Sequence, residues 1–378
     1  MVHVSDLISE DIESYLAAHE QKELLRFITC GSVDDGKSTL IGRMLYESHM
    51  LFDDHLAALE ADSKKVGTQE GEIDFALLVD GLAAEREQGI TIDVAYRFFS
   101  TDKRKYIVAD TPGHEEYTRN MATGASTADV AIILVDASQG VLTQTRRHSF
   151  IVSMVGVKRI ILAVNKLDLV DYSEEVFNQI KSDYTNFANE ALTLEEITAI
   201  PISALKGDNI VESSENTPWY DGQSVMEYLE TVEVAASSQS RPFRMPVQWV
   251  NRPNREFRGF AGLIGSGCIS AGDKIRVLPS GTESTVARIV TYDGDLELAG
   301  AGRSVTLTLT DEIDISRGDI ITSADSPCSS ADQFQARILW MNDSAMMPGR
   351  QYLFKSNSQT SPMTLGRLKH RIDVNTLE

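Results

Sequence analysis

The sequence is poor in cysteine and lacks any long hydrophobic segment. Its three cysteines, Cys30, Cys268 and Cys328, lie far apart without CxxC spacing, which argues against a disulfide framework and against a zinc site. The longest apolar run, VAIILV at 130–135, is much shorter than the ~20 residues of a membrane span. The acidic N-terminus has no apolar segment typical of a secretory signal. We therefore expect a cytoplasmic protein that does not associate with membranes.

Basic residues are also few. The chain has 35 Lys and Arg against 56 Asp and Glu, so its formal net charge is −21. A field of this sign repels nucleic-acid phosphates and argues against nucleic acid as the main partner, although one local basic face could still bind RNA. A length of 378 residues indicates two or three domains with ample material for a buried core.

Between residue 25 and about residue 230, short apolar runs alternate with helical patterns. The runs LRFITC, KYIVAD, VAIILVDA, RIILAVNK and AIPIS predict buried strands, and STLIGRMLYES, TQTRRHSFIVSMVG, EEVFNQIKSDYTNFANEA and SVMEYLETVEV predict helices. This alternation predicts an α/β domain with a mainly parallel sheet and helices on both faces. ITIDVAYRFFS is expected to add an antiparallel edge strand. Apolar spacing over 8–26 predicts a further helix, which either docks on the domain or binds a partner.

A change in composition at SSQSRPFRMP, 237–246, which is rich in Ser, Gln and Pro, indicates a linker. Short β-rich runs broken by turn residues follow it and predict antiparallel β-barrel domains. SPCSSADQ, at 326–333, indicates a second boundary, after which FQARILWMN and RQYLFKSN are expected to start another β module. The predicted domains are therefore 1–240, with the N-terminal helix as an extension, then 241–328, then 329–378 as an incomplete barrel.

The stretch GSVDDGKST, residues 31–39, lies between a predicted strand and a predicted helix. Gly31, Gly36, Lys37 and Ser38 satisfy the P-loop pattern, whose backbone N–H groups wrap phosphates. Lys37 would neutralise β- and γ-phosphate oxygens, and Ser38 would ligate Mg²⁺. The competing interpretation is a chance glycine turn. The other residues of the predicted phosphate loop are Ser32, Val33, Asp34, Asp35 and Thr39.

Two further motifs name the base. NKLD and SALK each follow a predicted strand, so they lie at the same sheet edge as the P-loop. Asp168 can accept from guanine N1–H and the 2-amino group, which adenine lacks. Lys166 can cover the ring, and Asn165 can tie its loop to the P-loop. A backbone N–H of the SALK segment can donate to guanine O6, so the motifs predict GTP. The SALK residues of the predicted site are Ser203, Ala204 and Leu205.

DTPGH and GITI predict a hydrolytic switch. Asp110 would hold Mg²⁺ through a water, or else act as a helix N-cap. Thr91 would ligate Mg²⁺ and contact the γ-phosphate, or else be an ordinary strand residue. The Gly113 N–H would contact the same phosphate. His114 would orient the attacking water, or else be a surface histidine. The predicted catalytic residues are His114, Thr91, Lys37 and Gly113.

These motifs together resemble translation-factor-type GTPases. Within that superfamily the sequence most resembles the large, GTP-binding subunit of bacterial sulfate adenylyltransferase (ATP sulfurylase). Asp35 stands where translation factors often have His or Ser. Asp34, beside it, either helps to hold a monovalent cation or stabilises the loop by a hydrogen bond. The strings that carry the resemblance are GSVDDGKSTLIGRMLYES, LLVDGLAAEREQGITIDVAYRFFST, ADTPGHEEYTRNMATGASTADVAIILVDA, PISALKGDNI, WYDGQSVMEYLE and FRMPVQWVNRPNREFRGFAG.

The resemblance implies a heterodimer or higher assembly. A small catalytic subunit makes adenosine 5′-phosphosulfate and pyrophosphate from ATP and sulfate, and GTP hydrolysis on the large subunit drives the reaction. Some large subunits are fused to an adenylylsulfate kinase with its own P-loop, and this sequence contains one P-loop only. SGTES, at 280–284, predicts a hairpin turn. The alternatives are a ribosomal translation factor and a switch whose GTP state only gates a partner. LFDDHLAALEADSKK is the first candidate for the partner surface.

Overall fold

The computed structural model describes residues 22–48, 75, 91, 93–234 and 239–376. The chain forms two compact units, the first of residues 1–232 with 371–378 and the second of residues 233–370. The division into three domains at 240 and 328 stays a prediction. Within the described ranges, no helix is both long and apolar enough to cross a lipid bilayer.

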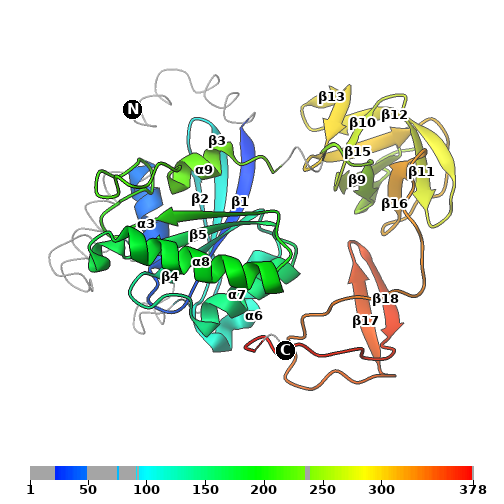
Figure 1. The fold of residues 1–378 in the computed structure, drawn as a ribbon. Helices are drawn as coiled ribbons and strands as arrows, with labels where there is room; N and C mark the ends of the chain where they lie inside the picture. Colours follow the sequence, from blue (N-terminus) through cyan, green and yellow to red (C-terminus); the bar gives the residue numbers. More distant parts are fainter. Residues whose placement is uncertain (1–21, 49–74, 76–90, 92, 235–238, 377–378) are drawn as a thin grey trace. The chain divides into compact units, whose positions relative to one another are not determined.

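The first unit is built on a six-stranded sheet (Figure 1). Its strand order is β2-β3-β1-β4-β5-β6, and every pairing is parallel except that of β2 with β3. β4 is buried along its whole length, as expected for a central strand covered on both faces. The parallel sheet and its antiparallel edge are therefore as the sequence predicts. The strands are β1 (Glu23–Cys30), β2 (Ala95–Ser100), β3 (Arg104–Asp110), β4 (Val130–Asp136), β5 (Arg159–Asn165) and β6 (Glu196–Pro201).

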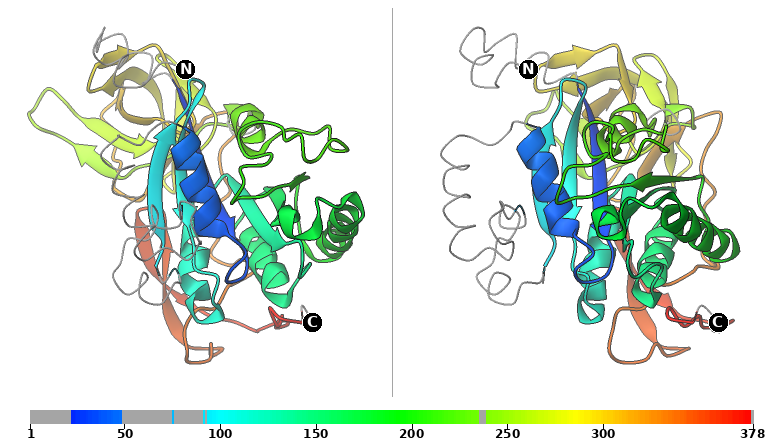
Figure 2. Two further views of the ribbon diagram at one scale, coloured as in Figure 1. Left: turned by 90° about the vertical axis from the view of Figure 1, so that its left-hand side faces the viewer. Right: turned by 60° about the vertical axis from the view of Figure 1, so that its left-hand side comes forward.

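Helices cover both faces of this sheet (Figure 2). Local sequence explains where two of them begin: Ser173 caps α8, and Ser224 and Glu227 form a capping box at α9. α6 was not among the predicted helices, because it is short and faces the core mainly with the small residues of TRNMATGA. The helices are α3 (Lys37–Glu47), α6 (Thr118–Ala125), α7 (Thr143–Met154), α8 (Glu174–Ala191) and α9 (Val225–Thr231), with short 3-10 turns η2 (Glu115–Tyr117) and η3 (Leu167–Val170).

One sheet edge collects the loops that matter for function. The P-loop follows β1, DTPGH follows β3, NKLD follows β5 and SALK follows β6. Because these strands are parallel, their carboxyl ends, and the loops after them, meet at the same edge. The fold thus brings together motifs whose first residues, Gly31 and Ser203, are 172 positions apart in the sequence.

The second unit contains an antiparallel sheet that closes on itself. Its order is β7-β16-β11-β12-β15-β9-β8, with β13 paired to β12. A bridge between Arg244 and Ser266 connects the β7 end to the segment after β9, around a buried core that includes Met245, Phe260 and Val277. SGTES lies at the turn between the antiparallel strands β11 and β12, as expected. The strands are β7 (Arg244–Pro246), β8 (Trp249–Asn251), β9 (Gly259–Leu263), β11 (Lys274–Leu278), β12 (Glu283–Thr291), β13 (Gly294–Leu296), β15 (Ser304–Leu309) and β16 (Ile320–Ser323). A separate pair is formed by β10 (Cys268–Ser270) and β14 (Leu298–Gly300).

Two sequence predictions about secondary structure are wrong. FQARILWMN, 334–342, forms no strand: it is irregular, and its large side chains Phe334, Ile338 and Trp340 are exposed. The rings of Phe334 and Trp340 contact Phe354 and Tyr352, so the apolar residues pack through side chains without pairing of the backbone. The nearby hairpin of β17 (Gln351–Ser356) and β18 (Gln359–Thr364) does form.

The predicted helix over 8–26 is wrong at its end, because Glu23 to Arg26 belong to β1. Pairing of β1 with β3, supported by an ion pair of 2.7 Å between Glu23 and Arg104, overrides the local helical spacing. Residues 8–21 of that helix and the predicted partner segment LFDDHLAALEADSKK lie outside the described residues.

Candidate functional site

The P-loop is a tight turn between β1 and α3. Gly36 is the N-cap of α3 with φ +89°, a left-handed conformation that favours glycine. A Cβ at Gly36 would clash with Asn165 Nδ2, so close packing also requires glycine here. The buried Asp35 carboxylate accepts a hydrogen bond of 2.5 Å from the Ser32 N–H, and burial raises the pKa of Asp35 to about 6. Of the remaining loop residues, Val33 and Asp34 lie in the turn and Thr39 lies in the first turn of α3.

Lys37 lies inside this turn. Its Nζ donates to Ser32 O at 2.6 Å and to Gly31 O at 3.4 Å. Burial lowers the pKa of Lys37, while the carboxylates of Asp110 and Asp35 act in the opposite direction. The lysine nitrogen is therefore held in the loop by backbone carbonyls, within reach of any anion that the loop N–H groups bind.

Hydroxyl groups from three separate segments converge on the Asp110 carboxylate. Ser38 Oγ donates to Asp110 Oδ2 at 2.8 Å, and Thr91 Oγ1 lies 3.5 Å from the same oxygen. Thr29 Oγ1 donates to Oδ1 at 3.3 Å. Burial raises the pKa of Asp110, and Lys37 opposes that shift. The structure therefore places all three residues predicted to hold a metal, Ser38, Thr91 and Asp110, in one cluster.

Gly113 packs against the P-loop. A Cβ at this position would lie 2.6 Å from Lys37 Nζ and 2.7 Å from Val33 N, so any side chain would force the two segments apart. His114, the next residue, is exposed, and its Nδ1 accepts the Glu116 N–H at 3.3 Å to cap η2. The structure thus places Gly113 at the phosphate loop and His114 at the surface beside it.

Asn165 connects three loops. Its Nδ2 donates to Asp35 O at 2.7 Å, and its Oδ1 accepts the Ala204 N–H at 2.9 Å. It therefore links NKLD to both the P-loop and SALK, which extends the predicted tie between NKLD and the P-loop. Arg43 of α3 adds a second link, since its guanidinium donates to the carbonyl oxygens of Ala204 and Leu205.

The NKLD turn presents Asp168 within η3. Lys166 has a left-handed backbone with φ +59°, and its Nζ forms an ion pair of 2.8 Å with Asp136 at the end of β4. Burial acts to raise the pKa of Asp136, but the hydrogen bonds from Lys166 and Ser138 hold this pKa below its usual value. In the facing loop, the buried Ser203 accepts the Lys206 N–H at its Oγ. Asp136 was not among the predicted residues, although its place after a buried strand at the functional edge is visible in the sequence.

Two buried or partly buried polar side chains of α7, Gln144 and His148, lie between the P-loop and Gly113. His148 Nδ1 accepts the Gly31 N–H at 3.2 Å, and His148 Nε2 lies 2.8 Å from Gln144 Nε2. Gln144 Nε2 in turn donates to Gly113 O at 2.9 Å. Gln144 and His148 are four residues apart on α7 and therefore share a helix face. This spacing is the one sequence signal that could have indicated them.

His148 makes the stability of the first unit depend on pH. Burial, followed by the charges of Lys37 and Arg147, lowers the pKa of His148 from 6.5 to about 3. The unfolded chain binds a proton here below pH 6.5 and the folded chain does not until about pH 3, so the free energy of unfolding decreases as the pH falls through that window. We expect His148→Asn, which retains an acceptor for Gly31, to lose this dependence.

Chemical unfolding of both proteins at pH 6.5 and pH 5 measures the effect. Between these two pH values the free energy of unfolding of the wild-type protein should fall by roughly 1–2 kcal/mol more than that of His148→Asn. Asp35, whose pKa is raised to about 6, contributes the opposite slope in this range, but it is present in both proteins and cancels in the difference. Parallel pH curves for the two proteins would contradict the prediction.

Comparison with known proteins identifies the family. The chain is 60% identical over 378 residues to sulfate adenylyltransferase subunit 1 of Aliarcobacter butzleri (strain RM4018), covering 100% of this chain and 81% of that protein. It is 58% identical to sulfate adenylyltransferase subunit 1 of Teredinibacter turnerae (strain ATCC 39867 / T7901), with the same two coverages. The chain belongs to the sulfate adenylyltransferase subunit 1 family. The resemblance seen in the sequence is thereby confirmed.

Two matches to domain families agree with this membership of the sulfate adenylyltransferase subunit 1 family. Residues 22–238 match the elongation factor Tu GTP binding domain, so the predictions of a GTP-binding domain and of a GTPase are confirmed at the level of the family. Residues 333–378 match the GTP-eEF1A C-terminal domain-like family. The GTPase-like domain of Saccharomyces cerevisiae Ski7, solved with bound GTP, superposes with a TM-score of 0.52 at 19% identity, covering 96% of this chain and 89% of that one. This last likeness concerns the fold alone.

Proposed function

We propose that this chain hydrolyses GTP to drive synthesis of adenosine 5′-phosphosulfate and pyrophosphate from ATP and sulfate on a separate small catalytic subunit. The observation that carries the proposal is the match to sulfate adenylyltransferase subunit 1 over the whole chain. The word subunit in those names supports a partner, and a single P-loop in the sequence supports the assignment of the ATP chemistry to that partner. The resulting complex is a heterodimer or a higher assembly in the cytoplasm.

The cluster at Asp110 suits a magnesium ion. Two hydroxyl oxygens and a buried carboxylate, from Ser38, Thr91 and Asp110, are the hard oxygen donors that Mg²⁺ prefers. A dication would also compensate the desolvation that raises the pKa of Asp110. Bound there with GTP, Mg²⁺ would neutralise charge on the β- and γ-phosphates.

Residues of the chain itself supply the remaining functions. The N–H groups of Gly31 and Ser32 already donate to His148 and Asp35, so the loop N–H groups after Ser32 cradle the phosphates. Lys37 adds a positive charge to them. The Gly113 N–H and Thr91 read the γ-phosphate, so loss of that phosphate releases both segments. At the other end of the nucleotide, Asp168 accepts from guanine and the SALK backbone donates to O6. We also propose that 241–328 and 329–378 are separate domains, and the family match of 333–378 supports the latter.

The coupling claim is tested by mixing the chain with a candidate small subunit, ATP, sulfate and GTP. Pyrophosphate and GDP are measured together in the same reaction. Pyrophosphate release that increases with GTP and stops with a non-hydrolysable analogue supports coupling. Release that ignores GTP contradicts it. GTP hydrolysis stimulated by ribosomes, and not by the partner with sulfate, would favour a translation factor. Full pyrophosphate release with the analogue would favour a switch that only gates its partner.

His114 is assigned to orientation of the attacking water. We expect His114→Ala to slow GTP hydrolysis by roughly 100-fold or more and to leave GTP binding nearly unchanged, because the residue acts on the water and not on the nucleotide. Single-turnover hydrolysis and equilibrium binding of GTP separate the two effects. His114→Asn is the matched variant, since its side chain retains an acceptor for the Glu116 N–H that caps η2. Full hydrolysis by His114→Asn would show that the role of His114 is capping.

A further inference from the structure

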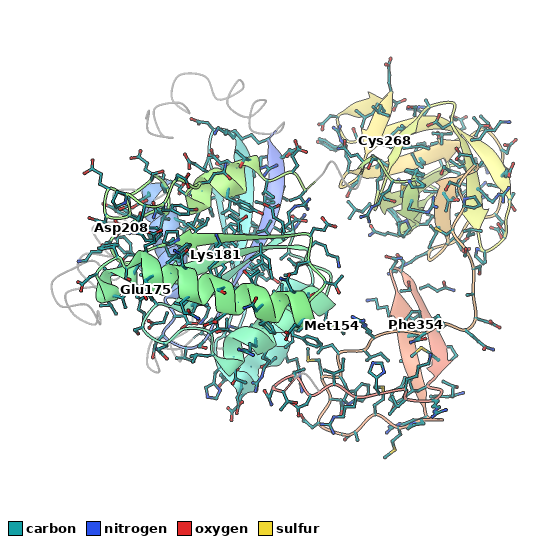
Figure 3. The ribbon with its side chains drawn as sticks, viewed as in Figure 1. Met154, Glu175, Lys181, Asp208, Cys268 and Phe354 are labelled. Atoms are coloured by element: carbon teal, nitrogen blue, oxygen red, sulfur yellow. The ribbon has the colours of Figure 1, made fainter. Side chains whose placement is uncertain are left out.

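A polar cluster around Asp208 joins the two loops assigned to the guanine base. We call Asp208, Tyr172, Ser214 and Asn216 the Asp208 clamp. Figure 3 shows Asp208 at the end of the first unit where α8 begins, near Glu175. The carboxylate is mostly buried and accepts three hydrogen bonds, from Tyr172 Oη at 2.8 Å, Ser214 Oγ at 2.5 Å and Asn216 Nδ2 at 2.9 Å. Three hydrogen bonds to a carboxylate stabilise its charged form in a buried position.

On the NKLD side, the clamp holds a residue with an unusual backbone. Tyr172 follows η3, which carries Asp168, and has φ +52°, a left-handed value that is rare for a bulky side chain. Three atoms of Tyr172 hold it there. Its N–H donates to Leu167 O at 2.9 Å, its O accepts from Trp219 Nε1 at 3.0 Å, and its hydroxyl donates to Asp208. Such a conformation persists only where the surroundings fix it.

On the SALK side, the backbone of Asp208 closes the turn that contains the proposed base-binding segment. Ser203 and Asp208 form a β-bridge in which the Ser203 N–H donates to Asp208 O at 3.4 Å, and the Gly207 N–H donates to Ser203 O at 2.8 Å. One residue therefore touches both base loops, SALK through its backbone and the end of NKLD through its side chain.

The loop after SALK has further hydrogen bonds that do not involve the Asp208 side chain. Asn209 already braces it, since Nδ2 donates to Pro201 O at 2.7 Å and to Thr217 Oγ1 at 2.9 Å, and Oδ1 accepts the Ser214 N–H at 2.8 Å. The bond from Tyr172 to Asp208 instead runs between the two loops. We propose that the Asp208 clamp is a positioning element that sets the spacing between Asp168 and the SALK backbone, and thereby guanine selectivity. The inference rests on the GTP site of the proposed function and not on coupling to sulfate.

Tyr172→Phe tests the proposal in the chain of 378 residues, because it removes the hydrogen bond to Asp208 and leaves the link from Asn165 to Ala204 in place. Binding of GTP, GDP and ITP is measured at equilibrium. We expect the Kd values for GTP and GDP to rise together, by about tenfold, the scale of one hydrogen bond. ITP lacks the 2-amino group and has less contact with Asp168 to lose, so the preference for GTP over ITP should shrink. Asp208→Asn, which replaces an acceptor oxygen with a donor, should act in the same direction.

Tyr220→Phe is the matched control. Its hydroxyl donates to Gln223 O at 2.9 Å and lies 3.5 Å from Ala199 O of β6. Neither acceptor belongs to NKLD or SALK, so the nucleotide selectivity of this variant should equal that of the wild-type chain. An unchanged GTP-to-ITP ratio in Tyr172→Phe would overturn the proposal, as would an equal loss of selectivity in Tyr220→Phe. If the wild-type chain itself does not prefer GTP to ITP, the guanine assignment fails and the clamp proposal fails with it. If the coupling to sulfate fails while the wild-type chain retains this preference, the clamp result still stands.

Discussion

Asp168→Asn is expected to lower the affinity for GTP by about 100-fold and to raise the affinity for XTP. In the proposed site the carboxylate accepts two hydrogen bonds from guanine, and a hydrogen bond to a charged group contributes ~1.5–3 kcal/mol. An asparagine amide presents a donor where guanine also presents one. Xanthine carries a carbonyl oxygen in place of the 2-amino group, so the same amide can donate to it. The substitution therefore inverts a polar contact, and does not simply remove one.

Competition binding with GTP and XTP measures this exchange. Asp171→Asn is the control, because Asp171 lies just beyond the same 3-10 turn with φ +53°, a conformation that asparagine tolerates. The control should keep the preference for GTP. An unchanged preference in Asp168→Asn would remove Asp168 from the base pocket and leave the guanine assignment to SALK alone.

Gly113→Ala should reduce GTP hydrolysis by roughly 100-fold or more and should weaken GTP binding more than GDP binding. The new Cβ would lie 2.7 Å from Val33 N and 2.8 Å from Ser32 C, both backbone atoms of the phosphate loop that cannot swing aside. The Gly113 N–H would then move from the γ-phosphate, and loss of one such donor costs on the order of 10²–10³ in rate. GDP lacks that phosphate, so its binding depends less on Gly113.

The measurement is the ratio of GTP to GDP affinity, together with single-turnover hydrolysis. Gly265→Ala is the matched control, since the nearest atom to its added Cβ is 3.6 Å away. Equal weakening of GTP and GDP binding in Gly113→Ala would show a general distortion of the P-loop. Unchanged hydrolysis would separate Gly113 from the reaction.

The fold was predictable where local pattern and tertiary packing agree. The apolar runs of β1, β3, β4 and β5 are buried strands in the structure, because only a doubly covered sheet accommodates such runs. Prediction failed where one of the two signals was missing. α6 is short and buries mainly small residues, so it was not predicted. In contrast, 334–342 has large apolar residues that contact β17 through their rings but do not pair with a strand.

The site was predictable from sequence as far as its motifs reach. The spacing of P-loop, DTPGH, NKLD and SALK identified residues that the parallel sheet then brings to one edge. Asp136, Gln144, His148 and Asp208 were not predicted, because each acts through a contact with a distant segment. A motif records which side chains face the nucleotide. The residues that hold those side chains in place are recognisable only once the chain is folded.

Asn165 has a consequence for how the nucleotide binds. One amide group joins the phosphate loop at Asp35 O to the base loop at Ala204 N. A ligand that orders one loop therefore orders the other, and the two ends of GTP should bind cooperatively. Guanosine and pyrophosphate, supplied as separate molecules, should each promote binding of the other. A nucleotide that joins guanosine to the phosphates should bind well only if its length matches the distance that Asn165 fixes between the two loops.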